Sequence, residues 1–204
     1  MWSPLKTTLG RSSWLVLLAC FILTGCPGPS PIPPAPPTPP PMIPVTHQLQ
    51  VSEHTSLNLT DAGADTILTD ATTVAQTNDG PGDVACVVGV SRNGGLTTFP
   101  APSIINSSAD LNDVLALPGN VKVVNQINWC GGFAPNIIGC APIPGTSLAV
   151  VRFTANQEGI LWLHEFGHNK GLNHRNDPNA VMAPTIAPTR RFVNIAECDA
   201  YRTP

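Results

Sequence analysis

Positive charge is scarce in this sequence. The 204 residues include 10 lysines and arginines against 13 aspartates and glutamates, and charged residues of both signs make up only 11% of the chain. Lys6 and Arg11 lie among the first 26 residues, so the remainder holds 8 basic and 13 acidic side chains, a formal charge of −5. Proteins that bind nucleic acid present a basic face to it. We therefore expect no nucleic-acid partner.

The sequence also lacks a hydrophobic run long enough to cross a bilayer, which takes about 20 apolar residues in a helix. The run from Trp14 to Leu23 has roughly half that length; it follows two basic residues and ends at Leu-Thr-Gly-Cys, residues 23–26. This is the layout of a secretory signal peptide. The four residues resemble the bacterial lipobox, whose cysteine is acylated and begins the mature protein. We expect residues 1–25 to be a lipoprotein signal peptide and the protein to be exported, anchored through lipid on Cys26 to the periplasmic or cell-surface side of a bacterial membrane. An ordinary signal peptide would instead release it.

The segment after Cys26 lacks most of its backbone N–H donors, because proline has none. Residues 27–44 contain 11 prolines in 18 positions, a composition typical of an extended polyproline spacer. At about 3.1 Å per residue such a spacer holds a domain up to roughly 55 Å from a membrane. We therefore expect residues 26–45 to be the lipidated cysteine and its linker, and residues 46–204 to form one folded domain.

The cysteines include no CxxC pair, which argues against a four-cysteine zinc site. Four cysteines follow Cys26, and an exported domain with four cysteines most often forms two disulfides. Cys130 and Cys140 enclose a loop rich in glycine with one proline, so we expect them to pair. Cys86 and Cys198 then pair by elimination.

Hydrophobic periodicity gives a coarse outline of the domain. Apolar residues at three- and four-residue steps predict an amphipathic helix over 62–77, and a second helix is expected over 156–170. A third, short helix is expected near 110–116 within a stretch, 91–120, that otherwise has the composition of loops. Strands are expected at 47–51, 84–90, 121–129 and 147–153. This order predicts a mixed α/β (α+β) domain.

One stretch, HEFGHNKGLNH at residues 164–174, concentrates side chains that bind metals. On a helix that starts with a capping box at Thr154–Gln157, His164 and His168 project from the same side and reach one ion. Gly171 can take the positive φ that ends the helix, which returns His174 as a third ligand. Glu165 lies beside the first ligand. The pattern predicts one zinc ion held by three histidines with a fourth position open.

The motif resembles HExxHxxGxxH, the zinc signature of metzincin metalloproteases, and Met182 in Ala-Val-Met-Ala-Pro resembles their Met-turn. The short spacing between them is similar to that of matrixins. The resemblance implies a twisted mixed sheet with two main helices, one of which carries HExxH. It also implies a small C-terminal subdomain with the Met-turn and a short helix.

The resemblance further implies a zinc endopeptidase that acts on extracytoplasmic proteins or peptides. Glu165 would be the general base toward a zinc-activated water, and Met182 would lie beneath the histidines. Residues 183–188 would form a pocket wall, and 147–153 would be an edge strand that pairs with substrate. We expect a monomer. No calcium site is expected, because the aspartates in the first helix, Asp61, Asp65 and Asp70, are typical of solvated or capping positions. The alternative function is a lipoprotein binding or scaffolding module whose zinc site does not catalyse.

Overall fold

The structure, a computed structural model, describes residues 43–204. The predicted signal peptide, Cys26 and most of the linker lie outside the described residues. Within residues 43–204, no helix is both long and apolar enough to cross a bilayer.

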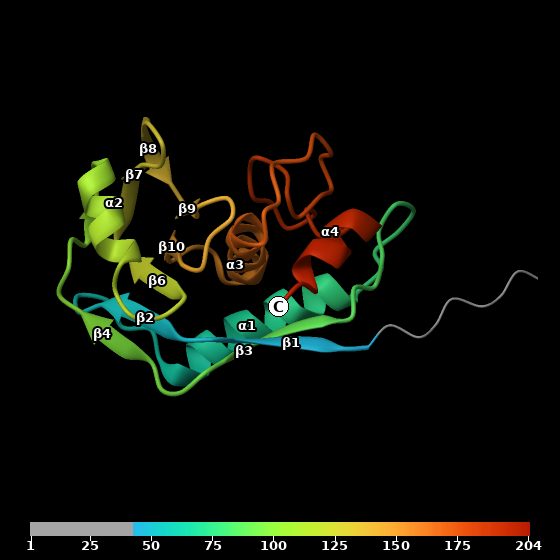
Figure 1. Ribbon diagram of the computed structural model, residues 1–204, viewed down its shortest axis with the longest axis horizontal. Coiled ribbons are helices and arrows are strands. Elements are labelled where there is room, and N and C mark those ends of the chain that lie inside the picture. The colour runs from blue at the N-terminus through green and yellow to red at the C-terminus, as the bar shows by residue number, and fades with distance from the viewer. Residues whose placement is uncertain (1–42) are drawn as a thin grey trace, which may run out of the picture. The chain divides into compact units, whose positions relative to one another are not determined.

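The described part of the chain forms four helices and ten strands (Figure 1). The helices are α1 (Asp61–Gln76), α2 (Ser108–Leu115), α3 (Ala155–Asn169) and α4 (Ile195–Tyr201). The strands are β1 (Val45–Leu49), β2 (Val51–His54), β3 (Val88–Arg92), β4 (Thr97–Phe99), β5 (Ile104–Ile105), β6 (Val121–Val124), β7 (Gln126–Trp129), β8 (Phe133–Ile137), β9 (Gly139–Cys140) and β10 (Leu148–Val151).

The largest sheet has five strands in the order β4-β2-β6-β10-β9. Its first four strands are parallel, and β9 pairs antiparallel with β10. A parallel pair, β1-β3, and a three-stranded sheet, β5-β7-β8, complete the strands of the described part. These mixed sheets with two long helices confirm the predicted fold class.

Successive side chains of the central strands point to opposite faces of the sheet and so belong to two different hydrophobic cores. Val121 and Val123 of β6 face the larger core, which includes the inner faces of α1 and α3. Val124 and Ala149 face the smaller core, beneath α2. Successive side chains of a strand point to opposite faces, so helices on both sides leave no face of β6 exposed. Full burial of each valine or leucine contributes roughly 1.5–3 kcal/mol.

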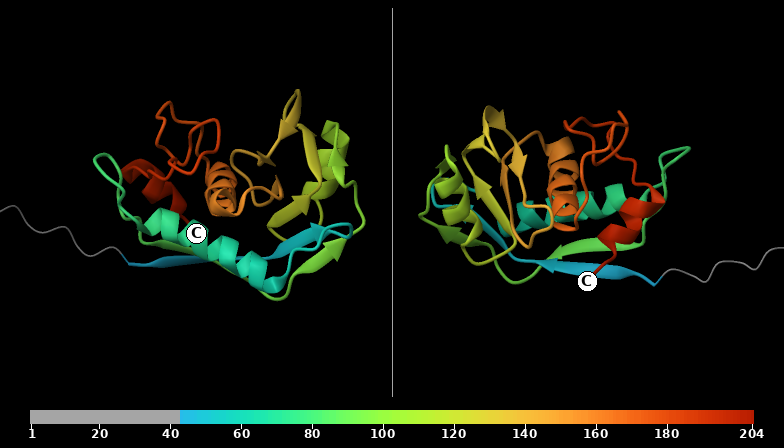
Figure 2. Two further views of the ribbon diagram at one scale, coloured as in Figure 1. Left: turned by 180° about the vertical axis from the view of Figure 1, so that it is seen from behind. Right: turned by 45° about the horizontal axis from the view of Figure 1, so that its top comes forward.

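The crossing of α1 and α3 fixes where the predicted metal-binding helix lies. A β-carbon at Gly159 of α3 would come within 2.7 Å of the Asp70 β-carbon and 2.8 Å of the Ala71 nitrogen in α1. Only glycine permits this approach without displacement of the α1 backbone. Figure 2 shows α1 (teal) crossing beneath α3 (orange) in the left view and behind it in the right view.

Two of the predicted strands are each divided between two sheets. The stretch 47–51 breaks at Gln50, whose N–H donates to Oδ1 of Asn120, and the chain continues from β1 into β2. The stretch 121–129 breaks at Asn125, whose N–H donates to the Ser103 carbonyl, between β6 and β7. A side chain accepts the bond at the first break and a backbone carbonyl accepts the bond at the second, and a period-two pattern shows neither.

The strand expected at 84–90 begins later than predicted. The Cys86 N–H donates to the Ala75 carbonyl at the end of α1, so ladder pairing starts only at Val88. The stretch 91–120, expected to be mostly loop, also contains the short strands β4 and β5 beside α2. These strands are too short to produce a periodic signal.

The prediction that residues 147–153 form an edge strand was wrong. β10 lies between β6 and β9, and the edge is the two-residue strand β9. The chain turns back after Cys140 and covers the side of β10 that would have been open. So short an antiparallel pairing has no period that the sequence could reveal.

The capping box predicted for α3 was also wrong. The Thr154 hydroxyl makes no cap hydrogen bond to the backbone and instead accepts one from the Gln157 side-chain amide at 2.6 Å. Glu158 accepts from the Phe153 N–H at 3.0 Å and pairs with Arg152 Nε at 2.6 Å. A long-chain carboxylate in the first turn therefore links the start of α3 to the preceding segment.

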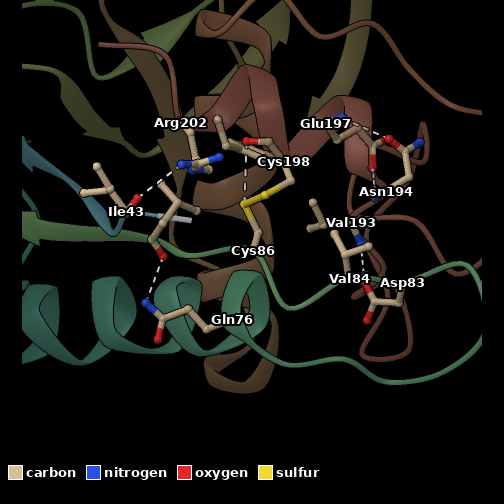
Figure 3. Close-up of a disulfide and its surroundings, with 12 residues drawn as sticks. Ile43, Gln76, Asp83, Val84, Cys86, Val193, Asn194, Glu197, Cys198 and Arg202 are labelled. Atoms are coloured by element: carbon tan, nitrogen blue, oxygen red, sulfur yellow. Dashed lines mark hydrogen bonds between the residues drawn. A yellow bond between two sulfur atoms is a disulfide. The ribbon is translucent and has the colours of Figure 1, made fainter. Parts of the chain in front are cut away.

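Both predicted disulfides are confirmed, Cys130–Cys140 and Cys86–Cys198. The second joins residues separated by 112 positions and ties α4 to the segment before β3 (Figure 3). The first closes the β7–β8 hairpin onto β9.

Candidate metal centre

Three histidines meet at the C-terminal half of α3. His164 and His168 lie one helical turn apart, and His174 approaches them from the loop that follows the helix. One nitrogen of each ring lies within 4.8 Å of the others, and the ring centroids are 4.7–5.2 Å apart. The structure therefore brings together the three residues that the motif predicted as ligands.

Two backbone carbonyls fix the tautomers of the first two rings. Nδ1 of His164 lies 2.7 Å from the Val181 oxygen, and Nδ1 of His168 lies 2.8 Å from the Leu172 oxygen. A carbonyl only accepts, so each Nδ1 carries the proton, which leaves the Nε2 lone pair free for a metal.

The turn that brings His174 back has the form of a Schellman motif. Gly171 has φ +85°, and its N–H donates to the His168 carbonyl. The Leu172 N–H donates to the Gly167 carbonyl at 3.0 Å. Both bonds satisfy carbonyls that the end of a helix leaves without partners. The positive φ is the conformation predicted for Gly171.

Glu165 points into a tight space beside the triad. It is 4% exposed, and its Oε2 is buried without a hydrogen-bond partner in the described part of the chain. Gly139 of β9 lies directly against it, because a β-carbon there would overlap Oε1 of Glu165. A buried carboxylate oxygen without a partner is costly in a fold, so this atom points to a proton or cation that the site accommodates.

Burial sets the ionisation of these groups. Desolvation lowers the pKa of His164 to about 4, and it also lowers the pKa of His168 and of His174. The three rings are therefore neutral at pH 7, the form that binds metals. Burial raises the pKa of Glu165 to about 8, and a cation held nearby would favour its charged form again.

The donor set fits zinc. Three neutral imidazoles with room for a further ligand form the arrangement of catalytic zinc sites, and the unpartnered carboxylate beside them is the group that such a site uses as a base.

The triad opens on a cleft of about 620 Å³. One side is formed by residues 136–141 together with Ile143, and the other by Pro184, Thr185 and Ile186. Glu165 and the three histidines supply the titratable groups of its lining. The expected wall, residues 183–188, thus contributes three cleft residues.

Comparison with known families agrees with this geometry. Residues 148–202 match the family model of the matrixins. This part of the chain is metzincin-like. The match runs from β10 through α4 and includes the triad, Glu165 and Met182. The similarity to this zinc metallopeptidase family is thus shown for residues 148–202.

Two solved structures resemble the chain at low identity. One is an archaemetzincin from Methanopyrus kandleri, with a TM-score of 0.49 and 15% identity over 76% of this chain and 93% of that chain. The other is described as a chaperone–substrate complex, with a TM-score of 0.48 and 12% identity. That alignment covers 78% of this chain and only 33% of the other. No curated protein matches the sequence.

Met182, in the segment that follows the triad, is fully buried. The Tyr201 hydroxyl donates to the Leu163 carbonyl at 3.1 Å and lies 3.3 Å from the Met182 sulfur. A β-carbon at Gly167 would lie 2.5 Å from that sulfur and 2.6 Å from the Tyr201 oxygen. Met182 is therefore packed between α3 and α4.

Two of the three aspartates that were expected to be solvated or capping residues also form ion pairs. Asp61 and Asp65 pair with Arg92 Nη1 and Nε at 2.6 and 2.8 Å. His47 is half-buried: its Nε2 lies 2.7 Å from the Tyr201 carbonyl oxygen, and its ring lies against Phe166.

Three residues at the metzincin-like site were not singled out from sequence: Gly139, Arg175 and Tyr201. Gly139 follows two isoleucines and lies in no recognisable motif. Tyr201 is the sole tyrosine of the chain, which is the one signal that could have directed attention to it. Arg175, directly after His174, stands out as a charged residue inside an otherwise neutral loop segment, 171–176.

Proposed function

We propose that this protein is a zinc-dependent endopeptidase with Glu165 as its general base. The observation that carries the proposal is the buried, unpartnered Oε2 of Glu165 next to three converging imidazoles. A structural zinc site is normally closed by four protein ligands and has no use for a buried carboxylate at this position.

The chain's own residues account for the steps of peptide hydrolysis. His164, His168 and His174 would hold zinc, which when bound acts as the Lewis acid for the scissile carbonyl. Glu165 accepts a proton from the attacking water at its Oε2 and returns it to the leaving amine. Its buried position holds that proton away from bulk solvent between the two transfers.

The open edge of β9 supports an extended peptide as the substrate. Residues 136–141 lie along the cleft, and β9 has a sheet partner on one side only, within the described strands. An extended segment can add to such an edge through main-chain hydrogen bonds. The isoleucines at 137, 138, 143 and 186 favour apolar substrate side chains near the scissile bond.

The proposal includes a location outside the cytoplasm, with the protein tethered by lipid on Cys26 through the proline-rich linker. Its support is the signal-like sequence before Cys26 and the two disulfides, which persist in oxidising compartments. Replacement of Cys26 by alanine should move the protein from the membrane fraction to the soluble fraction.

The test compares wild type, Glu165→Gln and a surface control, Asp199→Asn, as full-length chains purified in detergent under oxidising conditions. Each is incubated with a diverse peptide library, and its zinc content is measured. We expect wild type and Asp199→Asn to cleave, and Glu165→Gln to lose at least about 100-fold in turnover at equal zinc. Zinc binding without cleavage by any of the three would favour the non-catalytic binding module.

A further inference from the structure

The three imidazoles are not equally supported. His164 and His168 are held by carbonyl partners at Nδ1, whereas the ring of His174 has no hydrogen bond within residues 43–204 and is exposed. Partners of this kind normally orient the histidines of a metal site. The position of His174 therefore depends on the backbone that carries it.

Arg175, the next residue, links that backbone to three other parts of the chain. Its N–H donates to the Met182 carbonyl at 2.7 Å, and its Nη2 donates to the Phe192 carbonyl at 3.0 Å. Its Nε lies 3.0 Å from Oε1 of Glu197 in α4, an ion pair whose geometry is not that of a hydrogen bond. Its Nη1 lies 3.3 Å from Oδ2 of Asp177. Both side chains of the Arg175–Glu197 pair are largely shielded, with exposed fractions of 23% and 7%.

We propose that Arg175 is a positioning residue that fixes His174 for metal binding by tying its loop to Glu197 of α4. The proposal rests on the metal-binding half of the proposed function and is independent of peptide cleavage.

Glu197 is a firm attachment point. Its Oε2 accepts the Asn194 N–H at 2.9 Å while the Asn194 side chain accepts the Glu197 N–H at 2.9 Å, a complete capping box. The adjacent Cys198 is bonded to Cys86, and Figure 3 shows the capping box and the disulfide on the same helix. The helix that carries Glu197 is thus joined by a disulfide to the segment before β3.

This arrangement makes a specific energetic prediction. Without the anchor, the loop after Gly171 samples more conformations, and the zinc ion must order His174 when it binds. Loss of residues that orient metal ligands typically lowers metal affinity by about 10- to 100-fold. A residue that served only the stability of the fold would leave the affinity of the folded protein unchanged.

The experiment measures the zinc dissociation constant of full-length protein by competition with a chromogenic chelator, alongside urea unfolding of the same samples. The variants are Arg175→Met, Arg175→Lys, Glu197→Gln and the double Arg175→Met/Glu197→Gln. Glu197→Gln retains a capping-box side chain but removes the charge facing Arg175. Arg191→Met is the matched control. Arg191 forms a comparable ion pair with Asp79, with 2.8 Å between Nε and Oδ2, and neither residue lines the cleft at the histidines.

We expect Arg175→Met to weaken zinc binding by about 10-fold or more, with a smaller loss in Arg175→Lys and in Glu197→Gln. The double variant should bind no more weakly than Arg175→Met, since both changes remove one contact. Arg191→Met should stay within about twofold of wild type.

Zinc affinity unchanged in folded Arg175→Met would overturn the proposal. If that variant does not fold, wild-type affinity in Glu197→Gln would overturn it equally. A wild-type protein that binds no zinc would instead sink the proposed function itself, so the two failures are distinguishable.

Discussion

Gly139 of β9 lies directly against the carboxylate of Glu165, with no space for a β-carbon between them. The edge strand β9 therefore packs directly on that carboxylate. Because Glu165 is buried, a side chain at position 139 must displace its carboxylate from the position that it holds beside the histidines.

Gly139→Ala should accordingly reduce peptide turnover by at least about 10-fold, the size expected when a catalytic group is displaced. Zinc content should stay at the wild-type level because none of the three histidines moves. Gly132→Ala in the neighbouring hairpin is the control, since a β-carbon there meets no atom within 4 Å. Equal turnover in both variants would show that the carboxylate position does not matter.

Gly171→Ala tests the turn between His168 and His174. A β-carbon has free space at this position, so only the φ of +85° opposes the substitution. The left-handed conformation costs alanine about 1–2 kcal/mol, and urea unfolding should show a loss of that size. Gly171→Asn should lose less, because asparagine tolerates this region better. Two variants as stable as wild type would contradict the assignment of strain to this turn.

Lys122 provides a test of pH dependence. It is fully buried on β6, where Nζ donates to the Gly119 carbonyl and to the Ser147 hydroxyl at 2.5 and 3.3 Å. Burial lowers its pKa from 10.5 to about 8. Between those values the unfolded chain binds a proton that the folded chain has released, so stability should rise with pH across this window.

Lys122→Met should remove that rise and should stabilise the protein at pH 7 by about 1–3 kcal/mol, since the cost of the buried charge disappears. Urea unfolding of wild type and variant at pH 7, 8.5 and 10 measures the difference directly. A stability difference that does not vary with pH would show that Lys122 is solvated in the folded state.

The sequence by itself determined the centre of the candidate site, because the relevant geometry is local. Residues four apart on a helix share a face, and a glycine three residues after His168 permits the turn that the structure contains. Both disulfides were predictable as well, since a short loop rich in glycine brings Cys130 to Cys140 and only two cysteines then remain.

Only the tertiary structure decided what surrounds the triad. Four contacts join segments that are distant in sequence: β9 beside β10, Gly139 against Glu165, the Tyr201 hydroxyl against the Met182 sulfur, and Arg175 with Glu197. Such contacts depend on how elements pack after they form, and packing leaves no periodic signal in the chain. Helical periodicity is a property of neighbouring residues, whereas support for a ligand comes from whichever side chains the fold places behind it.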